Sequence, residues 1–312
     1  MILTVTLNPS VDISYKLNHF SLDSVNRVAD VTKTAGGKGL NVARVLKQLG
    51  EEVASSGFLG GSLGGFIRRG ISKLGIHDYF VHIEGETRNC IAVIHEGQQT
   101  EMLESGPQVD KDEVSQFLDE FSEYVQKVDI VTISGSLPKG LDNDFYVQLV
   151  KLANEYETPL LLDTKGELLE QTLAFEHKPF LIKPNREELE DLIGEKINDE
   201  AQMVAALTTQ RFTNVPWVVV TAGDSGAIVK HSQGIYRVTT PKVDAVNPVG
   251  SGDAVIAGFA SGLSHKLDDE RLIKYGLAMG VLNAMEAKTG SINPAKISWC
   301  MDQIFVEKVL IS

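Results

Sequence analysis

The residues best suited to chemistry lie in the segment NPVGSGDAVIAGF, residues 247–259, where two glycines flank a serine and an aspartate follows. Apolar residues at four-residue spacing predict a helix that begins near Ser251. The first N–H groups of such a helix lack intrahelical partners, and their partial positive charge favours an anion. Gly250 and Gly252 have no side chain that would keep a ligand away. The segment therefore predicts an anion site with Asp253 in its first turn, although an aspartate there can also serve only the helix dipole.

A second glycine-rich segment, TAGGKGLNVARVL at 34–46, also precedes a predicted helix. Glycine at position 39 after Lys38 rules out a Walker A loop, and the spacing is not GxGxxG. The segment offers close backbone approach, a cation and the amide of Asn41, or alternatively only a tight turn with a surface lysine. Together with Asp12, which follows the first predicted strand, the two segments predict a site for a polar substrate and an anionic cosubstrate.

The composition restricts the class of protein. The chain has 312 residues, 43% hydrophobic and 23% charged, with a net charge of −13. This balance is typical of a globular protein and argues against binding to nucleic acid or to an anionic membrane. The two cysteines, Cys90 and Cys300, form no metal-binding pattern, and we expect a reduced, cytoplasmic chain without a signal peptide or a membrane span.

Strands and helices alternate along the sequence. Short apolar runs predict strands at 2–7, 52–60, 129–135, 159–164, 180–185 and 217–223. Amphipathic segments predict helices between them, including 39–50, 64–75 and 142–157. The alternation predicts a doubly wound α/β fold with a mostly parallel sheet flanked by helices. Polar residues such as Asp163 and Asn185 follow the strands, which predicts a ligand crevice at the carboxyl edge of the sheet.

Two segments interrupt this alternation, at 11–35 and at 88–105. Both alternate polar and apolar residues, and EGQQ within the second segment is typical of a hairpin turn. We expect them to form a small antiparallel sheet that stands off the main fold. No repeat or linker divides the chain further, so residues 1–312 are expected to form a single domain.

These motifs resemble those of one family. AGGKGLNVA and NPVGSGDAVIAGF are similar to the two signatures of ribokinase-like (PfkB-type) carbohydrate kinases, and they stand in the same order. ISGSLPKG (133–140), KPNREEL (183–189) and VTAGDSGA (220–227) resemble further motifs of the family. The resemblance extends over nearly the whole chain and is strongest with the branch that phosphorylates phosphosugars. It implies a ribokinase-like fold in which segments 11–35 and 88–105 form a β-sheet lid.

The resemblance also implies roles for individual residues. Asp253 would be the catalytic base, and the anion hole would be formed by the N–H groups of Gly250, Ser251 and Gly252. The sugar hydroxyls would be held by Asp12, Gly36, Gly37 and Asn41. The sugar phosphate would be held by Arg27, Lys38 and Arg88. The nucleotide would be bound by Lys183, Asn185, Thr221, Gly223 and Gly226. Mg²⁺ would be oriented, largely through water, by Asn185 and Glu188.

The implied activity is ATP- and Mg²⁺-dependent phosphorylation of a ketohexose phosphate. Tagatose 6-phosphate, converted to the 1,6-bisphosphate in lactose and galactose breakdown, is the expected substrate; fructose 1-phosphate and fructose 6-phosphate are alternatives. A sensing protein that keeps the fold without the chemistry is a further alternative, which the intact GSGD sequence disfavours. A homodimer joined through the lids is also implied. Asn247 stands where many members carry an aspartate, and the lost charge argues against activation by a monovalent cation.

Overall fold

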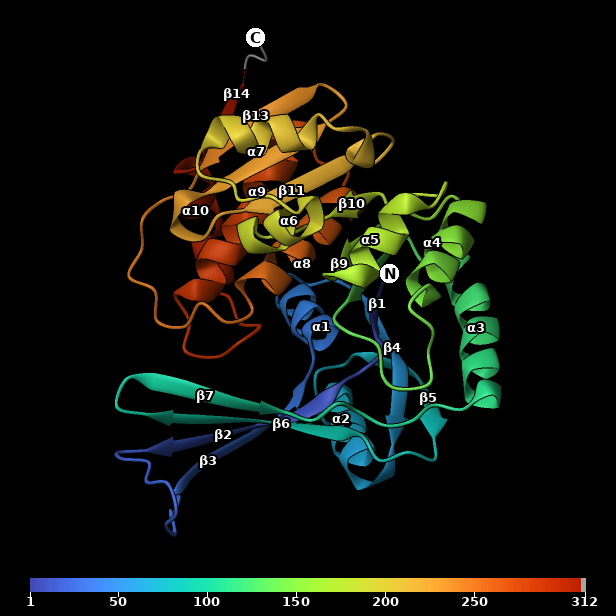
Figure 1. The fold of residues 1–312 in the computed structure, drawn as a ribbon, viewed down its shortest axis with the longest axis vertical. Helices are drawn as coiled ribbons and strands as arrows, with labels where there is room; N and C mark the ends of the chain where they lie inside the picture. The colour runs from blue at the N-terminus through green and yellow to red at the C-terminus, as the bar shows by residue number, and fades with distance from the viewer. Residues whose placement is uncertain (310–312) are drawn as a thin grey trace.

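In the computed structural model, residues 1–309 are described and form a main sheet and a separate small sheet (Figure 1). The last three residues of the predicted domain, 310–312, lie outside the described residues. The main sheet runs in the order β14 (Phe305–Lys308), β13 (Gly234–Thr239), β12 (Ala227–His231), β11 (Trp217–Thr221), β10 (Leu181–Ile182), β9 (Leu160–Asp163), β8 (Ile130–Ser134), β1 (Ile2–Thr6), β4 (Val53–Gly60) and β5 (His77–Ile83). Strands β5 to β11 in this order are parallel, and β12, β13 and β14 continue the sheet antiparallel.

Helices cover both faces of the main sheet. One apolar core lies under α1 (Lys38–Gln48), α2 (Gly61–Lys73), α8 (Ser251–Ser264), α9 (Asp269–Ala284) and α10 (Ile297–Asp302). The other lies under α3 (Lys111–Val125), α4 (Phe145–Glu155), α5 (Glu167–Ala174), α6 (Arg186–Ile193) and α7 (Glu200–Leu207). Short 3₁₀ helices are η1 (Gln210–Phe212), η2 (Gly223–Ser225) and η3 (Pro294–Lys296). The predicted doubly wound fold is confirmed. Within residues 1–309 no helix has both the length and the apolar character needed to traverse a bilayer.

Strand β10 is shorter than the sequence predicts. It spans Leu181–Ile182, whereas the apolar run predicts a strand over 180–185. Pro184 has no N–H with which to continue the ladder. Asn185 caps helix α6 and so belongs to the next element. The early end of β10 leaves the polar residues after it at the carboxyl edge of the sheet.

The small sheet stands apart from the main body, as Figure 1 shows. Its strand order is β3 (Asp30–Gly36), β2 (Ser10–Leu17), β6 (Arg88–His95) and β7 (Gln98–Leu103). The prediction of an antiparallel sheet is wrong for its central pair, because β2 and β6 are parallel. Both strands leave the carboxyl edge of the main sheet in the same direction, β2 after β1 and β6 after β5. Each returns through an antiparallel neighbour, and the predicted turn lies at Glu96 and Gly97, both with positive φ.

Helix α8 is held in place by its close packing against α9. A Cβ atom on Gly258 would lie 2.8 Å from the Cα of Gly276, and one on Gly276 would lie 2.4 Å from the ring of Phe259. The two glycines therefore allow the helix backbones to approach. Because α8 carries Asp253 in its first turn, this contact also positions the site.

Replacing Gly276 with alanine should force this packing apart. We expect Gly276→Ala to destabilise the fold by about 1–3 kcal/mol, the usual cost of overpacking, measured by urea unfolding. Gly65→Ala, in helix α2, is the matched control, because its Cβ would meet nothing closer than an Arg69 nitrogen at 3.4 Å. The control should be neutral or stabilising by up to about 1 kcal/mol. Equal effects of the two substitutions would contradict the packing argument.

Candidate active site

The two glycine-rich segments meet at the carboxyl edge of the main sheet. Helix α1 begins at Lys38 and helix α8 at Ser251. The Asn41 amide donates a hydrogen bond from Nδ2 to Oδ2 of Asp253 at 2.7 Å, across 212 positions of sequence. Asp253 is 5% exposed and Asn41 is 7% exposed. The structure thus joins the amide and the carboxylate that the sequence predicts for one site.

The first turn of α8 is where the sequence predicts an anion site. Gly250 caps the helix with a φ of 83°, in the left-handed region that favours glycine. A Cβ on Gly252 would lie 2.9 Å from Nζ of Lys183, so the missing side chain leaves room for a cation. The N–H of Ser251 already donates to the carbonyl of Pro248 at 3.2 Å. An anion would therefore have to displace that carbonyl to bind Ser251.

A buried carboxylate near the first turn of α8 pairs with two lysines. Asp163, at the end of β9, is 1% exposed. Its Oδ2 lies 3.4 Å from Nζ of Lys38 and its Oδ1 lies 3.3 Å from Nζ of Lys183. Burial opposes the charge of Asp163, but the two lysines outweigh it and hold the pKa below its ordinary value. Burial likewise opposes the charge of Lys38, and Asp163, Asp253 and Glu188 together raise its pKa.

The pKa of Asp253 is shifted in the opposite direction from that of Asp163. Burial, followed by repulsion from Asp163, raises its pKa to about 6. Lys38, the hydrogen bond from Asn41 and Lys183 oppose this shift. A carboxylate with a pKa of about 6 is ionised at neutral pH and is a better proton acceptor than an ordinary aspartate. This is the property expected of a general base.

The residues predicted to hold sugar hydroxyls lie where the small sheet meets α1. The Asp12 carboxylate accepts a hydrogen bond from the Ser10 hydroxyl at 2.7 Å. A Cβ on Gly36 would lie 2.0 Å from Cγ of Asp12, so glycine is required for the carboxyl to occupy this position. Gly37 has a φ of 115° and turns the chain from β3 into α1.

The two predicted phosphate-binding arginines differ in their placement. Arg88 lies at the base of the small sheet and donates to the carbonyls of Asn8 at 3.0 Å and Glu104 at 2.7 Å. The guanidinium has five N–H groups, and those not used in these bonds can donate to a ligand. Arg27 lies in the exposed segment 18–29 at the far end of the small sheet. The structure does not bring Arg27 to the other site residues.

The predicted nucleotide residues occupy adjacent segments after β10 and β11. Asn185 forms a β-bridge with Thr221, and Lys183 precedes Asn185 in the same segment. Gly223 and Gly226 lie in the turn between β11 and β12, with φ of 59° and 87°. A Cβ on Gly223 would meet nothing within 4 Å, which leaves the backbone open to a flat ligand.

Asn185 and Glu188 form a capping box at the start of α6. Oδ1 of Asn185 accepts from the N–H of Glu188 at 2.8 Å, and Oε2 of Glu188 accepts from the N–H of Asn185 at 2.9 Å. Within residues 1–309, no three His, Cys, Asp or Glu side chains form a metal-binding cluster. Oxygen donors without a full protein cage fit Mg²⁺, which keeps several waters and enters with the phosphates.

Two site residues had no role assigned from the sequence. Asp163 was noted only as a polar residue after a strand, and the apolar run LLLD that ends in it is the available signal. Arg44 is the second. It lies three residues after Asn41 on the buried face of α1 and donates to Oδ1 of Asn41. A cation three residues after a predicted site residue, on the same face of one helix, is the signal that could have identified it.

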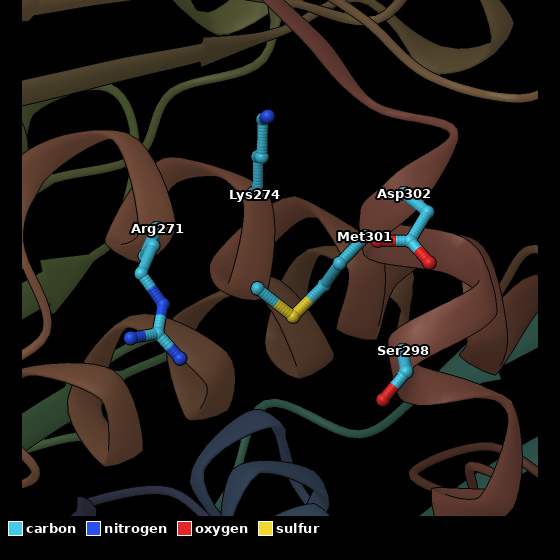
Figure 2. A pocket seen from close by; sticks show the side chains of 5 residues that line it. All are labelled: Arg271, Lys274, Ser298, Met301 and Asp302. Atoms are coloured by element: carbon cyan, nitrogen blue, oxygen red, sulfur yellow. The ribbon is translucent and has the colours of Figure 1, made fainter.

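A hollow of about 390 Å³ lies on the surface between α9 and α10 (Figure 2). It is lined by Arg271, Lys274, Ser298, Met301 and Asp302. Lys274 is already paired with Glu270 at 2.7 Å. None of the predicted site residues lines this hollow.

Comparison with known proteins agrees with the geometry. Residues 5–296 match the model of the pfkB family carbohydrate kinases. The chain belongs to this family. It is 50% identical over 310 residues to tagatose-6-phosphate kinases of two Staphylococcus epidermidis strains, covering 99% of this chain and 100% of each relative.

Solved structures of similar proteins show the same fold. Phosphofructokinase-2 from Escherichia coli, in complex with potassium, superposes with a TM-score of 0.88 at 26% identity, covering 96% of this chain and 98% of that one. A Staphylococcus aureus protein described as a candidate phosphofructokinase gives a TM-score of 0.85 at 31% identity, covering 99% of both chains. The predicted ribokinase-like fold is confirmed.

The raised pKa of Asp253 predicts that the carboxylate lowers stability at neutral pH. The folded chain holds the proton more tightly than the unfolded chain, whose aspartates titrate near 3.8. Stability is therefore lost as the pH rises from 3.8 to about 6, and the full loss is present above that pH. We expect Asp253→Asn to be more stable than the parent at pH 8, by up to about 3 kcal/mol, with the difference shrinking towards pH 4.5.

The measurement is the melting temperature at both pH values. Asp119→Asn, at an exposed position on α3, is the control and should leave the melting temperature unchanged. A destabilised Asp253→Asn at pH 8 would contradict the raised pKa.

Proposed function

We propose that the protein transfers the γ-phosphoryl group of ATP to O1 of tagatose 6-phosphate, giving tagatose 1,6-bisphosphate. The observation that carries the proposal is the buried Asp253, held by Asn41 in the first turn of α8. The full-length relatives named tagatose-6-phosphate kinase support the choice of sugar. This activity fits a cytoplasmic enzyme of lactose and galactose breakdown.

In the proposed mechanism, Asp253 accepts the proton of the attacking sugar hydroxyl. Phosphoryl transfer depends mainly on positioning and on stabilising charge. The start of α8, with the N–H groups of Gly250, Ser251 and Gly252, would face the transferred group. Lys183 is 5% exposed and would contact the phosphates once they replace its partner Asp163.

The sugar would bind between the main body and the small sheet. Asp12, Gly36, Gly37 and Asn41 would hold its hydroxyls. Lys38, Arg88 and Arg27 would hold its phosphate. Lys38 lies beside Asp163 rather than beside Arg88. It would therefore also stabilise negative charge on the phosphoryl group during transfer. Arg27 would reach the sugar only if the small sheet closed as a lid, which would exclude water as a competing acceptor.

The nucleotide would lie along the turn that holds Thr221, Gly223 and Gly226. Asn185 and Glu188 would hold Mg²⁺ through its waters, and the ion would neutralise charge on the phosphates. The NH₂ group of Asn247 donates a hydrogen bond to the carbonyl of Ala287 at 3.3 Å. A bound cation would be coordinated by oxygen acceptors only, whereas this position presents a donor. We therefore propose that turnover needs no monovalent cation.

Fructose phosphates are the second candidate substrates. The related solved structures include proteins named phosphofructokinases. Tagatose and fructose differ only in the configuration at C4, and turning a ketofuranose over nearly exchanges its two CH₂O arms. One site could therefore accept fructose 6-phosphate or fructose 1-phosphate.

A coupled ADP-release assay across the three ketose phosphates tests the activity. We expect the highest kcat/KM with tagatose 6-phosphate, and a loss of about 10²–10⁴-fold in kcat for Asp253→Asn, because a general base contributes that much. Asp119→Asn serves again as the control. ADP release by Asp253→Asn close to the parent rate, or no sugar-dependent release by the parent, would contradict the proposal.

The small sheet is also proposed to join two copies of the chain. Every residue of β7 is exposed, and Met102 and Leu103 are 51% and 63% exposed. A four-stranded sheet that leaves such apolar groups in water gains from a partner.

We expect sedimentation equilibrium to give twice the chain mass of 34.0 kDa. Leu103→Asp should shift the protein towards monomer, because a carboxylate would be buried in the contact. Phe175→Asp, which alters a 42% exposed residue outside the small sheet, is the control. A monomeric parent at all concentrations rules out the dimer.

A further inference from the structure

We propose that Arg44 is a positioning residue. It holds the Asn41 amide against Asp253 and connects the end of strand β3 in the small sheet with that carboxylate. This inference rests on the proposed function, since it assigns Asp253 the role of base. Arg44 contacts the carbonyl of Ala35 and the amide of Asn41, and it acts on Asp253 through Asn41.

The hydrogen bonds of the guanidinium determine which way the amide points. Arg44 donates from one terminal nitrogen to Oδ1 of Asn41 and from the other to the carbonyl of Ala35 at 2.5 Å. A guanidinium has only donors. The amide oxygen must therefore face Arg44, and Nδ2 must face Asp253, as observed. A flipped amide would place its NH₂ against the cation and its oxygen against the carboxylate.

The contact with Ala35 brings the small sheet into the same network. Ala35 lies in β3, beside Gly36 at the point where the chain turns into α1. Both direct partners of Arg44 are neutral acceptors. Burial lowers the pKa of Arg44, and the nearby carboxylates of Asp12 and Asp253 oppose that shift. The guanidinium of Arg44 therefore lies in the field of Asp12, a predicted sugar-binding residue, and of Asp253.

The charges around Asp253 come from several elements. Asp163 on β9 raises its pKa, whereas Lys38 and Asn41 on α1 and Lys183 after β10 lower it. Removing Arg44 would take away a positive charge and release the amide that donates to the carboxylate. Both changes favour the protonated form. Because the base works only when ionised, activity should then be lost at a higher pH on acidification.

The test is the pH dependence of kcat for the parent, Arg44→Met, Arg44→Gln and Arg44→Lys. We expect the acid limb to move up by about one pH unit in Arg44→Met and Arg44→Gln. Arg44→Lys should leave the limb near the parent position but lower the plateau kcat, because one ammonium keeps the charge without the fork that holds both acceptors.

The matched control is Arg68→Met. Arg68 on α2 also donates to a backbone carbonyl, that of Phe80 at 3.0 Å, and pairs with Asp78. Its loss should cost stability and leave the acid limb unchanged. A merely structural role for Arg44 predicts the same outcome for Arg44→Met, and an unmoved acid limb in both Met and Gln variants would overturn the proposal.

A second readout separates this inference from the proposed function. The Asp253 carboxyl can be titrated by ¹³C NMR without substrates and assigned by its loss in Asp253→Asn. If the parent phosphorylates no ketose phosphate, the proposed function fails, and a higher midpoint in Arg44→Gln than in the parent still supports the positioning role. Equal midpoints would overturn it. If Arg44→Met does not fold, Arg44→Gln and Arg44→Lys decide the matter.

Discussion

The hydrogen bond from Asn41 to Asp253 is the contact on which the site depends. It joins the first turns of α1 and α8, two helices from opposite ends of the chain. Each helix start brings glycines to the same edge of the sheet. Strand β3 of the small sheet runs through Gly36 and Gly37 into α1, so this bond also connects that strand with the carboxylate.

The buried charges around this bond form an alternating arrangement. Asp163 holds Lys38 and Lys183 at its two oxygens. Burial, followed by the negative charge of Asp163, raises the pKa of Asp253. One carboxylate therefore remains ionised and neutralises the lysines, while the other becomes a stronger base. Incoming phosphates would replace Asp163 as the ion-pair partner of the two lysines. The same cations would then neutralise Asp163 in the empty site and the phosphates in the loaded site.

Much of the main sheet and of the two helix starts could be predicted from the sequence. Buried parallel strands appear in the sequence as short apolar runs. The glycines before Asp253 predict a helix start that a ligand can approach closely. The parallel pairing of β2 with β6 could not be predicted, because it depends on where two distant strands leave the main sheet. The roles of Arg44 and Asp163 depend on partners that only the folded chain brings together. For Asn185 and Glu188 the sequence pattern is compatible with two roles. The capping box observed at α6 and a proposed magnesium site use the same two side chains, so the pattern alone does not choose between them.

The central claim is that the hydroxyl to be phosphorylated lies against Asp253 while the existing phosphate lies towards Arg88. The most direct measurement is a crystal structure of the protein with tagatose 6-phosphate and a non-hydrolysable ATP analogue. The account predicts the sugar O1 within about 2.6–3.2 Å of an Asp253 carboxylate oxygen, with the 6-phosphate on the side of Arg88. A sugar bound with its 6-phosphate against Asp253, or with O1 outside hydrogen-bond reach, would contradict it.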